Sequence, residues 1–305
     1  MATRMPGVGD GATVPHSHVR LRGRLWRHLS RSPSGIIGAV IVTAALVVAL
    51  FAPWLAPADP YAQRLDRALR PPLWIAGGGW DNPLGTDTLG RDLLTRVMYG
   101  ARVSLMVGFV AVALSAPMGV LIGATAGYFG GIWGQVAMRV ADGQLAIPSL
   151  LLATAVVGVL GASIRNIILV LGVSGWVLYA RIARAEALAL REKEFVEAAR
   201  ATGCSDKWII ARHVVPNLLT PVTVMGTFAV AYMILVESSL SFLGLGAPPP
   251  TPTWGGLLND GLRYIEIAWW LSVFPGAAIA AVVLGVNLLG DWVRDYLDPR
   301  SRAIL

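Results

Sequence analysis

The sequence contains few charged residues for its length. Only 14% of its 305 residues are Asp, Glu, Lys or Arg, while 55% are hydrophobic and the mean hydropathy is +0.62. An ordinary soluble domain carries about 25% charged residues, so this chain has too little polar surface to cover one water-exposed globule. Several apolar stretches reach the roughly 20 residues that a helix needs to cross a bilayer. The composition therefore predicts a membrane protein whose apolar helices lie in lipid.

Cysteine and histidine are also scarce. The single cysteine, Cys204, excludes an internal disulfide and any metal site built on several cysteines. The four histidines, which all lie outside the apolar stretches, are His16, His18, His28 and His213. An intramembrane serine protease would need a base beside a nucleophile such as Ser163, and an intramembrane metalloprotease would need histidine ligands. Both enzyme classes are therefore excluded, and no metal site is expected.

Lysine is almost absent, and the positive charge comes from arginine. The two lysines, Lys193 and Lys207, do not lie in a glycine-rich phosphate-binding loop, which excludes an ATPase. The net charge of +7 would suit a nucleic-acid binder, but the arginines crowd two segments, 20–31 and 181–212, that flank apolar stretches. Basic residues in such places fix the orientation of a membrane protein. We therefore expect no nucleic-acid partner and a cytoplasmic N-terminus.

Six candidate membrane spans follow from the apolar stretches. They cover about 35–56, 102–128, 135–160, 164–184, 217–243 and 267–290. The prediction is an all-α membrane protein with six transmembrane helices, whose six crossings return the C-terminus to the cytoplasm. Pro117, Pro148 and Pro275 lie inside spans, where neighbouring groups must satisfy the carbonyls that each proline leaves free.

The spans divide the chain into four parts. These are a basic cytoplasmic tail at 1–34, an N-terminal transmembrane helix with an extracytoplasmic segment at 35–100, a core at 101–291 with a charged loop at 185–215, and a cytoplasmic C-terminal tail at 292–305. Within the first tail, residues 19–31 fit either a basic helix on the membrane surface or a disordered anchor. The sequence does not choose between these two.

The charged loop at 185–215 carries the clearest local signals. A first helix is predicted to stop at Gly203, since glycine readily takes the left-handed conformation that ends helices. Ser205 is the expected N-cap of a second short helix, with Asp206 in its first turn, and Pro216 is expected to end that helix. Such a bent element suits docking into a groove on a partner. An amphipathic loop that rests on lipid fits the same pattern.

Three charged residues lie in or near the spans. Arg139 and Asp142 stand three apart on the third span, so they share a helix face and can pair, either as a gate or subunit contact or as a structural pair. Glu237 lies at the edge of an apolar run, where a carboxylate usually faces a cavity or a partner. It would contact the amino group of a transported substrate or cap a neighbouring helix.

The charged loop also resembles a known family motif. Glu197-Ala198-Ala199, then Gly203, then Pro216 is similar to the EAA loop of ABC importer permeases, although His213 and Val215 stand where that loop usually has Ile and Leu. In that family the loop forms a coupling helix that sits in a cleft of the ATPase subunit. The coupling residues that this resemblance implies are Glu197, Ala198, Ala199, Arg200, Gly203 and Pro216.

A second motif narrows the resemblance. It lies in the predicted extracytoplasmic segment and comprises Gly85, Thr86, Asp87, Gly90, Arg91 and Asp92. It resembles the signature of dipeptide, oligopeptide and nickel permeases, and the ending Leu297-Asp298-Pro299-Arg300 is similar to that of their second, C-type subunit. The resemblance implies the type I ABC importer permease fold and a place in the bacterial inner (plasma) membrane.

The same resemblance implies a set of partners. They are a paralogous permease subunit, one or two ABC ATPase subunits, an extracytoplasmic solute-binding protein and the lipid bilayer. This chain would bind no cofactor, because ATP and Mg belong to the partner subunits. The expected function is passage of di- or oligopeptides, with nickel chelates or glutathione as alternatives. A secondary transporter driven by an ion gradient is the rival class, but the inverted repeats usual in such proteins are not evident.

Overall fold

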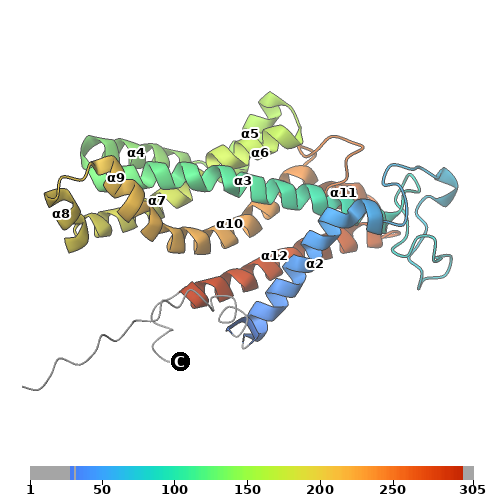
Figure 1. The fold of residues 1–305 in the computed structure, drawn as a ribbon. Helices are drawn as coiled ribbons and strands as arrows, with labels where there is room; N and C mark the ends of the chain where they lie inside the picture. Colours follow the sequence, from blue (N-terminus) through green and yellow to red (C-terminus); the bar gives the residue numbers. More distant parts are fainter. Residues whose placement is uncertain (1–27, 31, 298–305) are drawn as a thin grey trace, which may run out of the picture.

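The computed structural model describes residues 28–30 and 32–297. Within them the chain is helical, and the only β-type contact is an isolated bridge between Thr86 and Asp92. The elements, labelled as in Figure 1, are α2 (Pro33–Leu55), η1 (Leu65–Arg67), α3 (Leu93–Phe129), α4 (Gly131–Leu145), α5 (Ser149–Leu160), α6 (Ile164–Ser174), α7 (Trp176–Arg191), α8 (Glu194–Ala201), α9 (Asp206–Ile209), η2 (Ile210–Val214), α10 (Val215–Phe242), α11 (Trp254–Leu262) and α12 (Trp270–Leu297). Most of the predicted N-terminal tail, with the helix or anchor expected at 19–31, and the last residues of the C-terminal tail lie outside the described residues.

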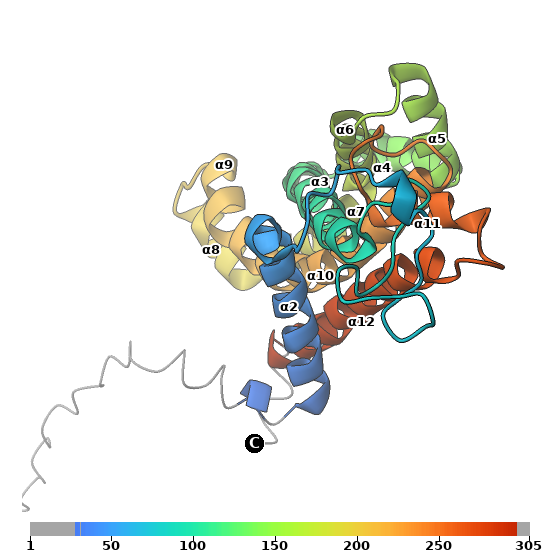
Figure 2. The same ribbon diagram turned by 90° about the vertical axis from the view of Figure 1, so that its right-hand side faces the viewer.

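The long helices run between two ends of the molecule that differ in structure. α3 packs against α2, α6, α7 and α10, and α12 packs against α2, α10 and α11. At one end, α8 and α9 form a bend beyond the last turn of α7 (Figure 1). At the other end, residues 57–92 form a long connection between α2 and α3, called the loop segment below (Figures 1 and 2). The two sequence motifs therefore lie at opposite ends of the bundle.

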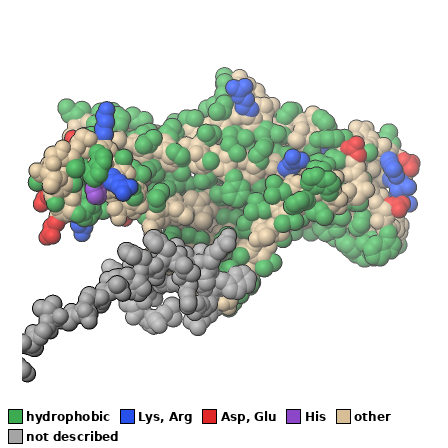
Figure 3. All heavy atoms as spheres, in the orientation of Figure 1, with side chains coloured by type: hydrophobic (Ala, Val, Ile, Leu, Met, Phe, Trp, Pro, Cys, Tyr) green, Lys and Arg blue, Asp and Glu red, His purple; other side chains and the backbone are tan. Residues whose placement is uncertain are grey.

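Five helical runs are long and apolar enough to cross a membrane. They are Pro33–Leu55, Leu93–Phe129, Ile164–Arg191, Asp206–Phe242 and Trp270–Leu297. A sixth crossing is formed if α4 and α5 are counted as one bent span. Figure 3 shows hydrophobic side chains along the middle of the molecule, with most charged side chains at its two ends. The predicted all-α membrane fold is confirmed, with five or six spans in the described residues.

Polar side chains fix where several helices begin. The capping oxygens belong to Ser32, Asp92, Ser163 and Thr253, and each accepts a hydrogen bond from the backbone N–H three residues on. Such caps satisfy one of the N–H groups that the first turn leaves unpaired. The Asp92 cap explains why α3 starts at Leu93, well before the predicted start of the second span at 102.

The third predicted span is a broken helix and not a continuous one. α4 ends at Leu145, α5 begins at Ser149, and the two helices meet at 84°. Pro148 has no N–H to continue the ladder and its ring excludes a regular helix before it. Gln144 stabilises the break, because its amide Nε2 donates to the Ser174 carbonyl at 2.6 Å and its Oε1 accepts from Trp176 Nε1 at 2.9 Å.

The expected helix end at Pro216 is wrong. The chain continues as a helix from Asp206 to Phe242, and Pro216 lies in the first turn of α10. A π-helical turn, η2, precedes it, in which the Val215 N–H donates to the Ile210 carbonyl. This wider turn changes the hydrogen-bond register next to a proline that has no N–H to give. The second short helix of the charged loop is therefore the first part of the fifth span.

Candidate coupling site

The predicted charged loop is mostly helical and bends at one turn. Its first part, predicted from 185, still belongs to α7, so the bent segment proper covers 192–214, with α8, a turn, α9 and η2. Gly203 takes a left-handed φ of +83° and its N–H donates to the Arg200 carbonyl, while the Cys204 N–H donates to the Ala199 carbonyl. This pair of bonds is a Schellman C-cap, which confirms the predicted helix stop.

Two buried side chains hold the bent segment on the bundle. Val196 of α8 and Ile209 of α9 are both 0% exposed and lie in one cluster with Ala124 of α3, Ala187 of α7 and Leu218 of α10. Each of the two short helices therefore contributes one apolar anchor.

The opposite side of the bent segment carries exposed apolar and charged groups. Phe195 is 43% exposed and Trp208 is 47% exposed, and the His213 ring lies between them, with ring centroids 5.8 Å and 5.1 Å away. Glu197 and Ala198 on α8 are also exposed. Aromatic side chains are enriched at protein interfaces. This surface suits a partner that approaches α8 closely.

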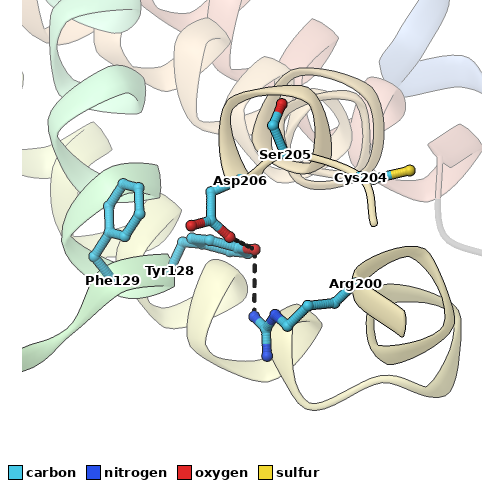
Figure 4. A pocket seen from close by; sticks show the side chains of 6 residues that line it. All are labelled: Tyr128, Phe129, Arg200, Cys204, Ser205 and Asp206. Carbon is cyan, nitrogen blue, oxygen red and sulfur yellow. Dashed lines mark hydrogen bonds between the residues drawn. The ribbon is translucent and has the colours of Figure 1, made fainter. Parts of the chain in front are cut away.

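The hydroxyl of Tyr128 joins α3 to both short helices. It donates to Asp206 Oδ1 at 2.7 Å and accepts from Arg200 Nη2 at 3.3 Å (Figure 4). Tyr128 lies in the last full turn of α3 and is only 5% exposed. The hydrogen bond to Tyr128 raises the pKa of Arg200.

The structure brings the predicted coupling residues into different surroundings. Ala199 is half-buried and its carbonyl takes part in the C-cap, Arg200 reaches Tyr128, and the exposed Pro216 lies on the adjoining α10. Ser205 occupies the N-cap position of α9, but its side chain makes no capping bond. Sequence reasoning missed Tyr128, which is 78 residues from Asp206; the only available signal was its place at a predicted span end.

The two charged residues of the third span do not pair with each other. Asp142 binds Arg181 of α7, with Oδ1 and Nη2 2.5 Å apart, and Arg139 makes no ion pair in the described part of the chain. The expected Arg139–Asp142 pair is therefore wrong, because α7 passes beside α4 and offers Asp142 a nearer cation. Both side chains of the observed pair are about half exposed, at 51% and 50%.

Glu237 is enclosed within this chain. It is 1% exposed, its Oε1 accepts from Ser241 Oγ at 2.7 Å and its Oε2 accepts from Ser238 Oγ at 3.4 Å. Both serines belong to α10 itself, so the expected cap on a neighbouring helix is not formed. The alternative role toward a substrate stays a prediction, and in the described conformation the carboxylate does not reach a surface.

In the loop segment, the second motif forms a buried charge network. The Asp87 carboxylate binds Arg91 Nε at 2.7 Å, contacts Arg96 Nη1, and accepts the N–H groups of Leu89 and Arg91, both at 2.9 Å. All three charged side chains are less than a tenth exposed. A buried carboxylate is stable only when paired and hydrogen-bonded in this way. Arg96 was not anticipated from sequence.

The remaining motif residues fix the backbone around this network. Thr86 Oγ1 accepts from the Arg70 N–H at 2.8 Å, and Asp92 caps α3. Gly85 and Gly90 have φ values of +83° and +70°, and a Cβ at Gly90 would lie 1.7 Å from the Arg64 carbonyl oxygen. Only glycine fits both the conformation and the space. The motif therefore holds the loop segment together.

A helical membrane fold with the bent segment at one end and the loop segment at the other is that of a class of membrane permease. The family described as binding-protein-dependent transport system inner membrane component matches residues 119–303, and the N-terminal TM domain of oligopeptide transport permease C matches residues 21–72. The chain belongs to this family of ABC importer permeases, in its peptide-transport branch. It is a non-catalytic membrane subunit, since ATP hydrolysis in such importers belongs to partner subunits.

Similar proteins extend along nearly the whole chain. The dipeptide transport system permease protein DppC of Escherichia coli K12 is 44% identical over 277 residues, which cover 91% of this chain and 92% of that protein. The di/tripeptide permease DppC of Pseudomonas aeruginosa UCBPP-PA14 is 40% identical over 277 residues, 91% of each chain. A putative peptide permease of Brucella suis is 43% identical over 298 residues, 98% of this chain and 95% of its own.

A solved structure confirms the fold. A chain of the inward-facing MetNI methionine ABC transporter superposes with a TM-score of 0.51 at 18% identity, covering 68% of this chain and 96% of that one. The type I importer permease fold predicted from the motifs is therefore confirmed. The EAA loop of this family corresponds to the bent segment. Family membership also sets aside the rival class, an ion-gradient transporter.

Proposed function

We propose that this chain pairs with a paralogous permease subunit to enclose a pathway for di- or oligopeptides, and that the bent segment docks on an ABC ATPase. The observation that carries the proposal is the outward side of that segment. Its aromatic side chains, Phe195 and Trp208, and its small and acidic residues, Ala198 and Glu197, are exposed although the fold offers them no role. A partner that covers them supplies one.

The docking proposal also fixes an orientation. The end that carries the bent segment faces the cytoplasm, together with both termini, and the loop segment faces outward, where a solute-binding protein delivers the substrate. The chain lies in the bacterial inner membrane and binds no cofactor itself. ATP and Mg lie on one or two ATPase subunits, whose closure moves the bent segment and opens the pathway outward by a rigid-body motion of helices.

Peptides are the proposed substrates because the similar permeases carry dipeptide and di/tripeptide names. Nickel chelates and glutathione are the alternatives, since permeases with the same loop motif serve them. Arg139 and Asp142 remain proposed as a gate or subunit contact, with Asp142 acting through its bond to Arg181. Arg139 and Asp142 on α4 and Arg181 on α7 are all exposed, which leaves them accessible to a second subunit.

Docking and orientation can be tested by thiol labelling. In a Cys204→Ser background, Ala198→Cys places one thiol on the bent segment, and Ala62→Cys places a matched exposed thiol on the loop segment. A membrane-impermeant maleimide should label the first only in inside-out vesicles and the second only in intact spheroplasts. Adding the ATPase subunits should protect the first thiol and leave the second unchanged.

Two outcomes would contradict the proposal. If the ATPase subunits do not slow labelling at position 198, the bent segment is not a docking surface. If the thiol at position 198 reacts from outside the cell, the orientation is wrong. Uptake of a radiolabelled dipeptide, measured with the binding protein present, tests the substrate separately from the docking.

A further inference from the structure

The end of α3 is hydrogen-bonded to the bent segment through one hydroxyl group, in addition to the apolar cluster that Ala124 and Tyr128 share with Val196 and Ile209. Tyr128 lies near the C-terminal end of a 37-residue helix, and its bonds reach Arg200 at the end of α8 and Asp206 at the start of α9. Both bonds involve a charged partner, and such bonds are roughly twice as strong as neutral ones. A single side chain thus contacts both sides of the Gly203 turn.

The contact made by the Tyr128 hydroxyl borders a hollow of about 610 Å³. This hollow is lined by Tyr128, Phe129, Arg200, Cys204, Ser205 and Asp206 (Figure 4). Gly203 itself has open space around it, since a Cβ on this glycine would meet nothing within 4 Å. On either side of it, Ala199 and Cys204 are partly buried against the cluster that contains Val196 and Ile209. The position of the turn relative to α3 therefore depends on the Tyr128 bonds and on these apolar contacts.

α3 is itself fixed to α7 along a glycine seam. Gly119, Gly123 and Gly127 recur at every fourth position, and a Cβ at each would lie within 2.3–2.6 Å of a carbonyl oxygen of α7. Helices that approach this closely slide past each other only by losing their packing. α7 leads directly into α8, so α3 and α7 form one body that ends at the bent segment.

We propose that Tyr128 is a positioning residue that makes α3 move together with the bent segment when the ATPase displaces it. The inference rests on the proposed docking. Without the hydroxyl, Val196 and Ile209 keep the bent segment on the bundle, but the two short helices can rotate about these anchors. Displacement of the docked surface then reaches α3 incompletely.

The substitution that isolates this role is Tyr128→Phe, which keeps the ring and removes the hydroxyl. Tyr99→Phe is the matched control, because Tyr99 lies on the same helix, is half-buried and makes no hydrogen bond through its hydroxyl in the described part of the chain. The experiment uses the complete transporter in nanodiscs. Spin labels at Leu121→Cys on α3 and Lys207→Cys on α9, in a Cys204→Ser background, report the distance between the two elements.

In the parent protein and in the Tyr99→Phe control, the distance between the labels should be the same without nucleotide and after trapping with ATP and vanadate. In Tyr128→Phe it should change by about 2 Å or more between the two states, the size of a typical helix shift. Import of a radiolabelled dipeptide per ATP hydrolysed should fall roughly tenfold, as expected for loss of a hydrogen bond to charged groups. ATPase subunits should still co-purify.

A double-mutant cycle tests whether Asp206 acts through the same contact. Asp206→Ala should reduce coupling, Asp206→Asn should retain most of it because the amide oxygen still accepts the bond, and Tyr128→Phe combined with Asp206→Ala should be no worse than Tyr128→Phe alone. Additive losses would overturn the inference. So would an unchanged distance in Tyr128→Phe, or loss of the ATPase subunits from it alone, which would assign the hydroxyl to the docking surface.

The labelling experiment separates a failure of this inference from a failure of the proposed docking. If position 198 is not protected by the ATPase, the proposed docking itself fails. If position 198 is protected and Tyr128→Phe couples normally, only this inference fails.

Discussion

The two motif regions use similar residue types in opposite ways. In the loop segment, the charges of Asp87 and Arg91 are buried and paired within the chain, and the glycines lie against backbone. In the bent segment, Glu197 is exposed and Gly203 has open space around it. A motif whose residues satisfy one another stabilises the fold, whereas a motif whose residues face outward needs a partner to explain it. Burial, and not residue type, separates the two roles.

The largest effect on stability is expected for Asp87→Ala. This change leaves the buried guanidinium of Arg91 without its carboxylate and leaves Arg96 with only the longer contact to Asp260 at 3.8 Å. Breaking a buried ion pair typically costs about 3–5 kcal/mol. Thermal unfolding in detergent and the amount of protein in the membrane would measure the loss. Asp66→Ala is the control, because the Asp66 side chain is 78% exposed and its contact with Arg67 is 3.9 Å long.

If Asp87→Ala abolished uptake while the unfolding temperature stayed that of the parent protein, the loop segment would have a functional role that its geometry does not show. The conclusion that the motif of the loop segment serves to stabilise the fold would then be wrong.

Alanine at two glycines with similar backbone angles should have unequal effects. Gly90→Ala is expected to destabilise the fold by roughly 2–4 kcal/mol, because the Cβ meets the Arg64 carbonyl in addition to the cost of a left-handed alanine. Gly203→Ala adds only the conformational cost of a left-handed alanine, about 1–2 kcal/mol. Unfolding midpoints of the purified variants would compare the two. Equal midpoints would show that contact with Arg64 is relieved by movement of the loop.

A bulky residue at the same turn sharpens the contrast. A Cβ at position 203 meets no atom of the described residues within 4 Å, so Gly203→Trp should remain folded in the membrane, while the ATPase cleft should no longer accept the turn. Uptake of dipeptide should fall although the membrane content is that of the parent. Normal uptake in this variant would count against docking at the turn.

The smallest effect on the fold is expected for Glu197→Ala. Glu197 is exposed and makes no hydrogen bond or ion pair with the residues that the structure describes. Substituting such a side chain usually changes stability by less than about 0.5 kcal/mol. Recovery of the ATPase subunits on the tagged permease should nevertheless decrease several-fold, and Glu194→Ala, one turn earlier on the same helix, should leave recovery unchanged. Equal recovery from both variants would remove Glu197 from the interface and leave the aromatic pair as its centre.

Hydrophobic runs predicted most of the fold, because a span is a local property of about 20 residues. The expected first span at 35–56 nearly coincides with α2, and the Gly203 stop was visible in the sequence. Proline alone did not predict where a helix breaks: α3 continues through Pro117, whereas the third span breaks at Pro148. The difference depends on which neighbours satisfy the freed groups, and a sequence pattern does not contain them.

The candidate site was predicted in part, for the same reason. The EAA-like residues and the turn are contiguous in the chain, so their pattern was readable. Tyr128 with Asp206, Asp142 with Arg181, and Arg96 with Asp87 are contacts between separate elements or across an irregular loop. Their pairing depends on how the helices pack, and no local pattern of residues encodes that packing.

Gln144 links two breaks in the helices of the bundle. One amide binds the carbonyl of Ser174 and the indole of Trp176, on either side of the interruption at Gly175, while its own helix ends at the break before Pro148. Straightening one of these two crossings alone would separate the half-buried amide from its partners. The two interruptions therefore behave as a single joint, and the chain has fewer independent ways to bend than its number of breaks implies.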